Sequence, residues 1–356
     1  MNMPPNIRVT QKQVAEAAGV SIAAVSRVLQ GEENFRITPE NRDKILQAAQ
    51  KMGYRHNVHA RTLRSGRSQL IGMINTSPFY PVLGQLMQGV ERQVVEKGYR
   101  FNFYNYFDLD PQVQQEKERK AVEYFLSVRA EGILVADYMA YLHTKSHLED
   151  FVAAQVPIVF LHLPPSMKGK SISSVEVDFY RGGQLVAESL LAQGHRHFAV
   201  ISDISEVGRK MRLAGYVDTI EKARQRDRTI TLATEIDIIS TELGHFYTHK
   251  LLTGQRPPTA IFCYNDFVAL GALKAANDLK LSVPRDVAFV GFDDLEFCPY
   301  TIPPLTSVAQ PITTIVEEGI KMLFKMIEQG DDMVGVSKKF APELRVRESS
   351  LLGRDL

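Results

Sequence analysis

The sequence of 356 residues contains no tryptophan and only two cysteines, Cys263 and Cys298. Two widely separated thiols exclude a disulfide framework and a CxxC motif, and they are typical of a reducing cytoplasm. No apolar run reaches the roughly 18 residues of a membrane span, and the N-terminal stretch MNMPPNIRVTQ lacks the apolar core of a secretory signal. We therefore expect a cytoplasmic protein.

Motifs of several enzyme classes are also absent. There is no phosphate-binding loop of the GxGxxG or Walker type and no GxSxG nucleophile elbow. The nine histidines are scattered, with His195 and His197 two residues apart, and we do not expect a metal site. Asp293 and Asp294 are adjacent, but neighbours on an extended chain point apart, which is poor geometry for acid–base catalysis. We expect no enzymatic activity, no metal and no cofactor.

The charge is unevenly distributed, although the net charge of the whole chain is only +1. Residues 1–67 contain eleven Lys and Arg against five Asp and Glu, a net charge of +6, and the remainder carries −5. A basic head on an acidic body predicts an anionic partner for the head alone. Because a charged run is more often a solvated surface, motifs within the head must decide between these interpretations.

The first 56 residues predict a small all-α domain. Thr10 with Gln13 three residues later forms a capping box for a first helix, and Gly19 ends that helix in a tight turn. Ser21 is expected to cap a second helix that runs to about Leu29. A turn this short between two helices is typical of a helix-turn-helix. A third helix, starting at Thr38-Pro39 and ending at Gly53, completes the domain.

The second helix is expected to pack inward through Val25 and Leu29. Its outward-facing residues near the N-terminus are then Ile22, Ala23, Ser26 and Arg27. A three-helix domain of this size is also common as an interaction module, so the pattern alone leaves both interpretations open.

Several segments resemble the LacI/GalR family of bacterial transcription regulators. In the head they are VAEAAGVSIAAVSRVLQG, TPENRDKI, GYRHN, and ARTLRSG ahead of IGMI. The resemblance implies a helix-turn-helix DNA-binding domain over 1–56, followed by a hinge helix and linker over 57–67. It implies double-stranded operator DNA as a partner.

The resemblance also implies individual DNA contacts. The base-reading positions are Ile22, Ala23 and Arg27, and the phosphate contacts are Thr10, Ser21, Ser26 and Asn34. Arg27 can form a bidentate pair with guanine, whereas Ile22 and Ala23 offer apolar surface that suits a thymine methyl group.

The hinge supplies a second set of implied contacts, which are Asn57, Ala60, Arg61, Leu63 and Arg64. A helix of about seven residues is unstable alone, so it should form only when two copies pair on DNA. Leu63 matches the family's leucine that wedges between base pairs from the minor groove, and pyrimidine–purine steps kink most easily. This predicts a homodimer on a pseudo-palindromic operator with a central CG step. The alternative is a plain linker.

From Gln69 onward, short apolar runs alternate with amphipathic stretches, which predicts βαβ units and parallel sheets. A first series has strands at 70–74, 101–106, 132–136 and 157–161, with helices near 83–97, 113–127 and 143–154. A second series has strands at 173–178, 198–202, 234–238, 259–263 and 287–292, with helices near 181–193, 208–225, 240–253 and 266–279. The final elements are a strand at 305–310, a helix at 311–329 and a strand within 339–349.

Two series predict two lobes within an effector-binding domain over 68–356. The expected N-lobe is about 68–165 and 303–330, and the expected C-lobe is about 171–298 and 334–356, with crossings near 162–171, 293–304 and 329–335. By resemblance, in RGGQLVAESLLAQGHR, RLAGY, YNDFVALGAL, VPRDVAFVGFDD and IPPLTSVAQP among others, this is the α/β periplasmic-binding-protein-like (type 1) fold.

Ligands of open α/β sheets bind at the carboxyl ends of strands, so we expect a small-molecule effector between the lobes. The residues implied to bind it are Phe79, Tyr80, Gln184, Arg212, Asn265 and Asp293. Gln184 stands where the lactose-repressor type has an arginine, which leaves sugars, sugar acids and nucleobases open as ligands. A carboxylate, a guanidinium and an aromatic wall suit vicinal hydroxyls, although Asn265 and Asp293 could instead cap a helix or turn.

We interpret the chain as a ligand-responsive repressor of carbohydrate-related genes that binds its operator as a homodimer and responds to a sugar or sugar derivative. The alternative is a soluble sugar-binding protein or sugar-processing enzyme with an incidental basic head.

Overall fold

The computed structural model describes residues 9–29, 35–54, 67–75, 80–105, 110–136, 147–161, 173–202, 207–236, 240–330 and 335–351. The chain divides into two compact units, a head over residues 1–68 and a body over residues 69–356. None of the helices in the described ranges combines the length and apolarity that crossing a bilayer demands.

The head contains three helices around a small apolar core. They are α1 (Gln11–Ala18), α2 (Ile22–Leu29) and α3 (Pro39–Lys51). Val14, Val25 and Ile45 are fully buried at the centre. Both ends of α1 follow the expected chemistry: Thr10 and Gln13 form the predicted capping box, and Gly19 ends the helix at φ 66°, in the left-handed region that glycine adopts most readily.

The starts of the other two helices also confirm the sequence prediction. The Ser21 hydroxyl accepts a hydrogen bond from the Ala24 amide at 3.1 Å. The Thr38 hydroxyl accepts one from the Asn41 amide at 3.4 Å, with Pro39 in the first helical turn. These hydroxyls satisfy amides that have no partner within the helix.

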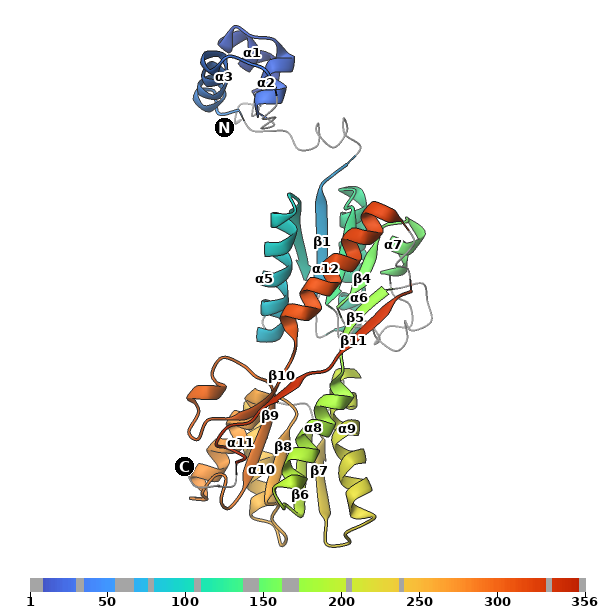
Figure 1. Ribbon diagram of the computed structural model, residues 1–356, viewed down its shortest axis with the longest axis vertical. Helices are drawn as coiled ribbons and strands as arrows, with labels where there is room; N and C mark the ends of the chain where they lie inside the picture. Colours follow the sequence, from blue (N-terminus) through green and yellow to red (C-terminus); the bar gives the residue numbers. More distant parts are fainter. Residues whose placement is uncertain are drawn as a thin grey trace. The chain divides into compact units, whose positions relative to one another are not determined.

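The first lobe of the body contains the strands labelled β1, β4, β5 and β11 in Figure 1. Its six-stranded sheet has the order β11-β5-β4-β3-β1-β2. Every strand pair in it is parallel. The strands are β1 (Leu70–Asn75), β2 (Arg100–Asn105), β3 (Gly132–Ala136), β4 (Ile158–Phe160), β5 (Ser173–Val177) and β11 (Ser337–Phe340).

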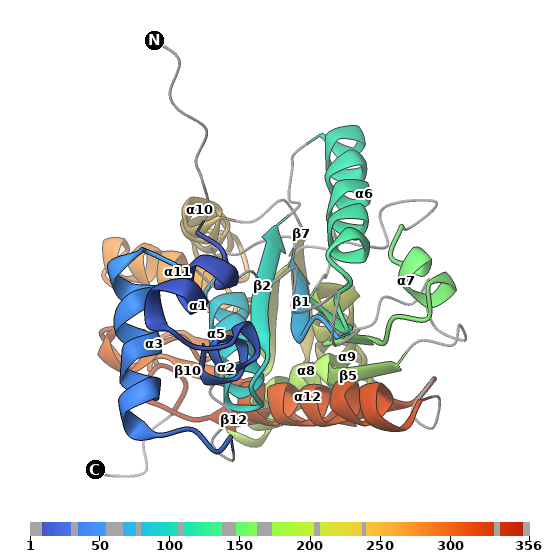
Figure 2. The same cartoon turned by 90° about the horizontal axis from the view of Figure 1, so that it is seen from above.

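Helices cover both faces of this sheet. They are α5 (Pro81–Glu96) and α12 (Ile312–Gln329) on one face, and α6 (Pro111–Ser127) and α7 (Glu149–Ala153) on the other. Figure 2 shows α5 and α6 on opposite sides of β1 and β2. Alternate residues of β1 serve the two faces, because Ile71 packs in the cluster of α5 and α12, and Leu70 in that of α6 and α7. A strand buried on both faces explains the continuous apolar run at 70–74.

The second lobe has a six-stranded sheet in the order β12-β10-β9-β8-β6-β7, in which only β10 and β12 pair antiparallel. Its strands are β6 (His197–Ser202), β7 (Thr231–Ile236), β8 (Ala260–Cys263), β9 (Ala288–Asp293), β10 (Thr306–Ala309) and β12 (Glu343–Arg345). Its helices are α8 (Phe179–Ala192) and α9 (Val207–Arg224) on one face, α10 (Thr241–Leu252) and α11 (Asp266–Asp278) on the other, and the short 3-10 helix η3 (Cys298–Tyr300).

The predicted lobe boundaries were wrong for three strands, β5, β10 and β11, the last of which was expected in the C-lobe but pairs with β5 in the first sheet. β5 was expected in the C-lobe but pairs with β4 and β11 in the first sheet. β10 was expected in the N-lobe but lies between β9 and β12 in the second sheet. The crossings therefore lie at 178, 310–311 and 341–342, where elements of the two lobes follow one another. Alternation of strands and helices does not reveal which edge the next strand joins.

The prediction of a single closing strand within 339–349 was also wrong. The chain forms β11 and β12, one in each sheet, separated by Ala341 and Pro342. Proline has no amide hydrogen to donate to a ladder, so it interrupts the strand where the chain changes sheets.

Candidate DNA-binding surface and effector site

The N-terminal turns of α2 present the predicted base-reading residues. Ile22 is 49% exposed, and Ala23 and Arg27 are also exposed. The Arg27 guanidinium lies 5.1 Å from the centre of the Phe35 ring, which restricts the orientation of a long side chain. The exposed surface of α2 thus offers an apolar side chain, Ile22, and a hydrogen-bonding guanidinium, that of Arg27.

The predicted phosphate contacts differ in their accessibility. Thr10 and Ser21 are exposed and lie at helix N-termini, where backbone amides favour anions. Ser26 is only 5% exposed, so its predicted outward orientation was wrong. It belongs with Val25 and Val28 to the buried residues of α2.

Seven of the predicted contacts lie outside the described residues and stay predictions. They are Asn34, Asn57, Ala60, Arg61, Leu63, Arg64 and Phe79.

Four of the six predicted effector residues meet at the carboxyl edge of the second sheet. Asp293 ends β9, Asn265 follows β8 as the N-cap of α11, and Arg212 projects from α9. Tyr80 comes from the first lobe, where it is the N-cap of α5. The side chains of Arg212, Asn265 and Asp293 come from residues that are at most 6% exposed. The cluster therefore joins the two lobes and is largely shielded from water.

The Asp293 carboxylate is the centre of this cluster. It accepts hydrogen bonds from the Tyr80 hydroxyl and from Gln310 Nε2, the latter at 2.5 Å, and Arg212 Nη2 lies 3.3 Å from its Oδ1. Burial raises the pKa of Asp293, while the Arg212 charge and these hydrogen bonds act in the opposite direction. A cation and two donors thus hold an acceptor with little access to solvent.

Arg212 is fixed from several sides. Its guanidinium lies 3.9 Å from the centre of the Phe292 ring and 4.7 Å from that of Phe179. Nη1 donates to the Tyr264 carbonyl at 2.9 Å, and the buried Nε has no hydrogen-bond partner. A buried donor without a partner costs free energy. A ligand that accepts a hydrogen bond from Arg212 Nε would therefore remove that cost.

Asn265 combines both roles that the sequence allowed. Its Oδ1 accepts from the Val268 amide at 3.0 Å and caps α11, which confirms the capping interpretation. Its Nδ2 donates to the Tyr80 hydroxyl at 3.2 Å. Burial, and then the charge of Asp293, hold the pKa of Tyr80 well above its usual range, so the phenol keeps its proton and donates to Asp293.

Gln184 takes a different position from these four. Its Oε1 accepts from Arg181 Nη1 at 3.4 Å, and Arg181 also bonds Glu188 on the same helix. No described hydrogen bond joins Gln184 to Asp293, so its predicted effector contact stays a prediction.

Sequence reasoning missed Gln310, Phe179 and Phe292 as parts of the cluster. Gln310 lies in the crossing between β10 and α12, and its buried Oε1 has no hydrogen-bond partner. Phe292 directly precedes Asp293 on β9, and Phe179 begins α8. Gln310 and Phe292 stand at the ends of predicted strands, and Phe179 directly follows the end of another, which is the only signal in the sequence that could have pointed to them.

Two further acidic residues of the second lobe, Asp294 and Asp266, lie next in sequence to members of the cluster. Asp294 pairs with Arg347 at 2.7 Å, whereas Asp293 pairs with Arg212. Asp293 and Asp294 have positive φ values, 106° and 51°, a strained conformation that is enriched at functional sites. The buried Asp266 carboxyl accepts from the Ser307 hydroxyl at 2.5 Å and from the Leu295 amide at 2.8 Å.

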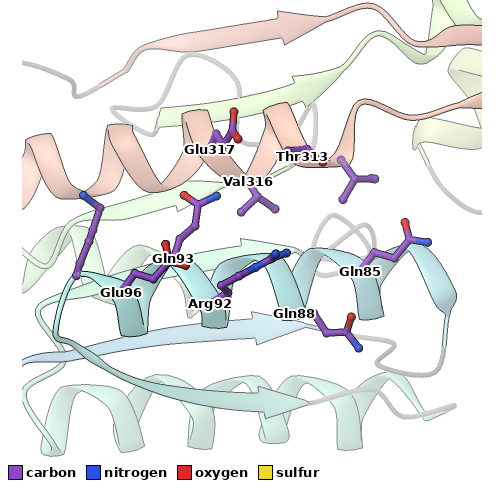
Figure 3. Close-up of a pocket in the computed structure, with 11 residues that line it drawn as sticks. Gln85, Gln88, Arg92, Gln93, Glu96, Thr313, Val316 and Glu317 are labelled. Carbon is purple, nitrogen blue, oxygen red and sulfur yellow. The ribbon is translucent and has the colours of Figure 1, made fainter.

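Two grooves lie on the surface of the body. A polar groove of about 730 Å³ separates α5 from α12, with Gln85, Gln88, Arg92, Gln93 and Glu96 on one side and Thr313, Val316 and Glu317 on the other (Figure 3). A second groove of about 480 Å³ between α10 and α11 contains Leu270 and Lys274. The second lobe also exposes Tyr300 by 81% and Ile302 by 95%, and exposed apolar residues of this size often mark contact surfaces.

Comparisons with known protein families give a match for the head and a match for the body. Residues 10–57 match the family described as bacterial regulatory proteins, lacI family, and residues 171–350 match the periplasmic binding protein-like domain. The chain is 32% identical over 346 residues to the HTH-type transcriptional regulator DegA of Bacillus subtilis (strain 168), which covers 97% of this chain and 98% of DegA.

Solved structures give the same result. The Lac repressor dimer bound to operator and the anti-inducer ONPF is similar with a TM-score of 0.80 and 26% identity, covering 97% of this chain and 99% of that one. The complex of the transcriptional regulator CelR with cellobiose has a TM-score of 0.68 and 26% identity, covering 96% and 100%. These relatives are transcriptional regulators rather than enzymes.

Proposed function

Because this chain belongs to the lacI family of bacterial regulatory proteins and is a DNA-binding transcriptional regulator with an effector domain, we propose that it represses carbohydrate-related genes as a cytoplasmic homodimer. The main observation in favour of a carbohydrate effector is the buried cluster around Asp293. The relative CelR, whose solved complex contains cellobiose, supports the same class.

The Tyr80 hydroxyl makes the bonds that we expect of a sugar hydroxyl. It donates to the Asp293 carboxylate and accepts from Asn265 Nδ2. A polyhydroxylated ligand can offer that pair of bonds and, from a neighbouring hydroxyl, an acceptor for the partnerless Arg212 Nε. The rings of Phe179 and Phe292 already hold the Arg212 guanidinium, so they are poor stacking partners for a nucleobase. The cluster therefore favours a sugar or sugar derivative.

The hydrogen bond between Tyr80 and Asp293 could couple effector binding to DNA binding. A ligand hydroxyl that takes the place of the phenol releases Tyr80, and with it the N-terminus of α5, from the second lobe. The change would bias the pairing of the hinge helices ahead of β1, because a ligand shifts an equilibrium by its differential affinity for the two states.

On the DNA, two heads are needed to read a pseudo-palindromic operator. In this proposal Ile22, Ala23 and Arg27 contact bases in the major groove, and Leu63 wedges into a central CG step from the minor groove. The exposure of the three α2 side chains supports the first part, and the family resemblance supports the second.

We assign the dimer contact to the outer face of α5 and to the region after Ile261. Arg92 and Glu96 are one turn apart on α5, so antiparallel pairing with the α5 of a second copy would place each Arg92 opposite a Glu96. That self-complementarity is what a two-fold interface requires. Exposed Leu270 and Ile302 supply apolar surface in the second lobe.

Thermal unfolding with added ligands tests the effector class. Cellobiose, ribose, gluconate and hypoxanthine are added separately to the wild type, to Asp293→Asn and to Arg212→Met, with Asp294→Asn as the control, because Asp294 pairs with Arg347 and not with Arg212. We expect a carbohydrate to raise the Tm of the wild type and the control but not of the two cluster variants. Stabilisation by hypoxanthine alone would refute the sugar class, and equal stabilisation of all four proteins would refute the site.

Tyr80→Phe separates displacement of the phenol from its retention. If the ligand must break the bond between Tyr80 and Asp293, removing the hydroxyl should tighten binding by about tenfold or more, since a hydrogen bond to a charged group contributes roughly 1.5–3 kcal/mol. Weaker binding by the variant would mean that Tyr80 stays in place beside the ligand.

Selection of binding sites from random duplexes tests the DNA half. We expect symmetric sites with a central CG step, and we expect Leu63→Ala to lose specific affinity while it keeps salt-dependent nonspecific binding. Recovery of asymmetric sites, or of sites without the central step, would contradict the proposed operator.

A further inference from the structure

Two glycines lie where α8 and α9 approach each other backbone to backbone. A Cβ on Gly183 of α8 would overlap the carbonyl oxygen of Arg212, and a Cβ on Gly215 of α9 would overlap the carbonyl oxygen of Tyr180. Each helix thus presents a glycine to the main chain of the other. No other residue type fits so close an approach without moving one of the helices.

A third glycine supports the ring beneath the Arg212 guanidinium. A Cβ on Gly182 would lie 2.7 Å from Cε2 and 2.8 Å from Cζ of Phe292. Phe292 is fully buried, and the guanidinium of Arg212 lies 3.9 Å from its ring centre. Because a close-packed interior leaves the ring little freedom, an added methyl group at Gly182 would tilt the surface on which the guanidinium rests.

We infer that Gly182, Gly183 and Gly215 are positioning residues for the effector site, which act through the main chain of Arg212 and the ring of Phe292. Gly183 and Gly215 set how deeply α9 lies against α8. Gly182 sets the ring that the guanidinium covers. Together they bring Arg212 Nη2 to 3.3 Å from Asp293, in a site whose geometry has to hold within about 0.5 Å. The inference rests on the proposed effector site, because it gives these glycines a role only if Arg212 has one.

The decisive pair of variants is Gly182→Ala and Gly72→Ala. At Gly72, on β1 of the first lobe, a Cβ would lie 2.6 Å from a ring carbon of Phe125, so the control introduces the same kind of clash far from Arg212. Gly183→Ala is a second, more severe variant because its clash is with the main chain. Since the Gly182 clash is with the far end of a side chain, that variant is expected to fold even if Gly183→Ala does not.

The measurement is the pKa of Asp293, obtained by ¹³C NMR titration of aspartate carboxyls in the full-length protein, with Asp293→Asn to assign the signal. The Arg212 charge lowers the pKa of Asp293. Displacement of the guanidinium in Gly182→Ala should therefore raise the pKa of Asp293, while Gly72→Ala leaves it unchanged at a similar loss of Tm. An unchanged pKa in Gly182→Ala, or an equal shift in Gly72→Ala, would overturn the inference.

No ligand enters this measurement, so it stands apart from the test of the proposed function. A failed ligand screen would leave the Asp293 titration fully interpretable. Conversely, a positive screen with an unshifted Asp293 pKa would refute the role of the glycines alone.

Discussion

Asp266 makes the stability of the body depend on pH in the direction opposite to that of most carboxylates. It is fully buried at the start of α11, where its oxygens hold the Ser307 hydroxyl of β10 and the Leu295 amide that follows β9. Burial first, and the negative charge of Asp293 second, raise the pKa of Asp266 to about 7. The other titratable groups against it are the thiols of Cys263 and Cys298.

The size and sign of the effect follow from proton linkage. The pKa of Asp266 rises from 3.8 in the unfolded chain to about 7 in the folded one, so the folded state binds the proton more tightly. Its contribution to stability is present below the unfolded pKa and is lost as pH rises through the folded pKa. At 1.36 kcal/mol per unit, the loss between about pH 5 and about pH 8 is on the order of 3 kcal/mol.

The assay compares unfolding of the wild type and Asp266→Asn at several pH values and constant ionic strength. The asparagine cannot titrate, and it loses one acceptor at every pH, so the informative quantity is the slope with pH rather than the absolute stability. We expect the wild type to lose on the order of 3 kcal/mol more than the variant over this range, or roughly 5 °C or more in Tm. Parallel curves for the two proteins would refute the reasoning, because they would show that Asp266 does not take up a proton in this window.

Three further predictions concern the head and the proposed dimer. Thr10→Ala removes the capping box and should speed hydrogen exchange of the α1 amides about fivefold, since a lost N-cap costs roughly 1 kcal/mol; unchanged exchange would contradict this. Arg27→Ala should weaken binding to the selected operator by roughly 1–3 kcal/mol and relax the preference at one guanine, which competition gel shifts with base-substituted duplexes would measure. Ile302→Glu should weaken the dimer by more than about 100-fold in sedimentation equilibrium, because a two-fold interface loses the burial of an apolar side chain, roughly 1.5–3 kcal/mol, twice. The control is Val113→Glu, which replaces an exposed residue of α6 and should leave the dimer unchanged.

Local structure in the head could be predicted because its determinants are close in sequence. The Thr10–Gln13 capping box spans three residues, and Thr38 with Pro39 marks the start of α3 within two. Ser26 was mispredicted because a helical pattern assigns faces by angle and takes no account of how short a side chain is. Burial at the edge of a face is decided by the neighbours that cover it.

The assignment of strands to lobes could not be predicted in the same way. β5 and β10 read as buried strands, and both are, but their partners lie far along the chain. β5 joins β11, which lies about 160 residues later, as the pairing of Ser174 with Ser337 shows. Hydrophobic alternation reports that a strand is buried and carries no information about which sheet buries it.

The cluster around Asp293, our proposed effector site, shows why its residues could be predicted only in part. Arg212, Asn265 and Asp293 lie in motifs of the second lobe, and the family resemblance identified them. Gln310 lies in the crossing that leads from β10 to α12, and its role depends on the carboxylate to which the fold brings it. No local pattern distinguishes such a residue from the polar end of any strand.

The partners of Asp293 explain why this position suits a sensor. One carboxylate receives the Tyr80 hydroxyl from the first lobe, the Gln310 amide from the crossing between lobes, and the Arg212 guanidinium from the second lobe. The carboxylate is buried and has few acceptor positions, so a ligand that claims one of them must displace a bond that holds parts of the body together. In the proposed mechanism, ligand binding and lobe arrangement therefore depend on the same set of hydrogen bonds, which would provide the differential affinity that regulation requires. A site built within a single lobe could bind a ligand equally tightly and would shift no equilibrium between lobe arrangements.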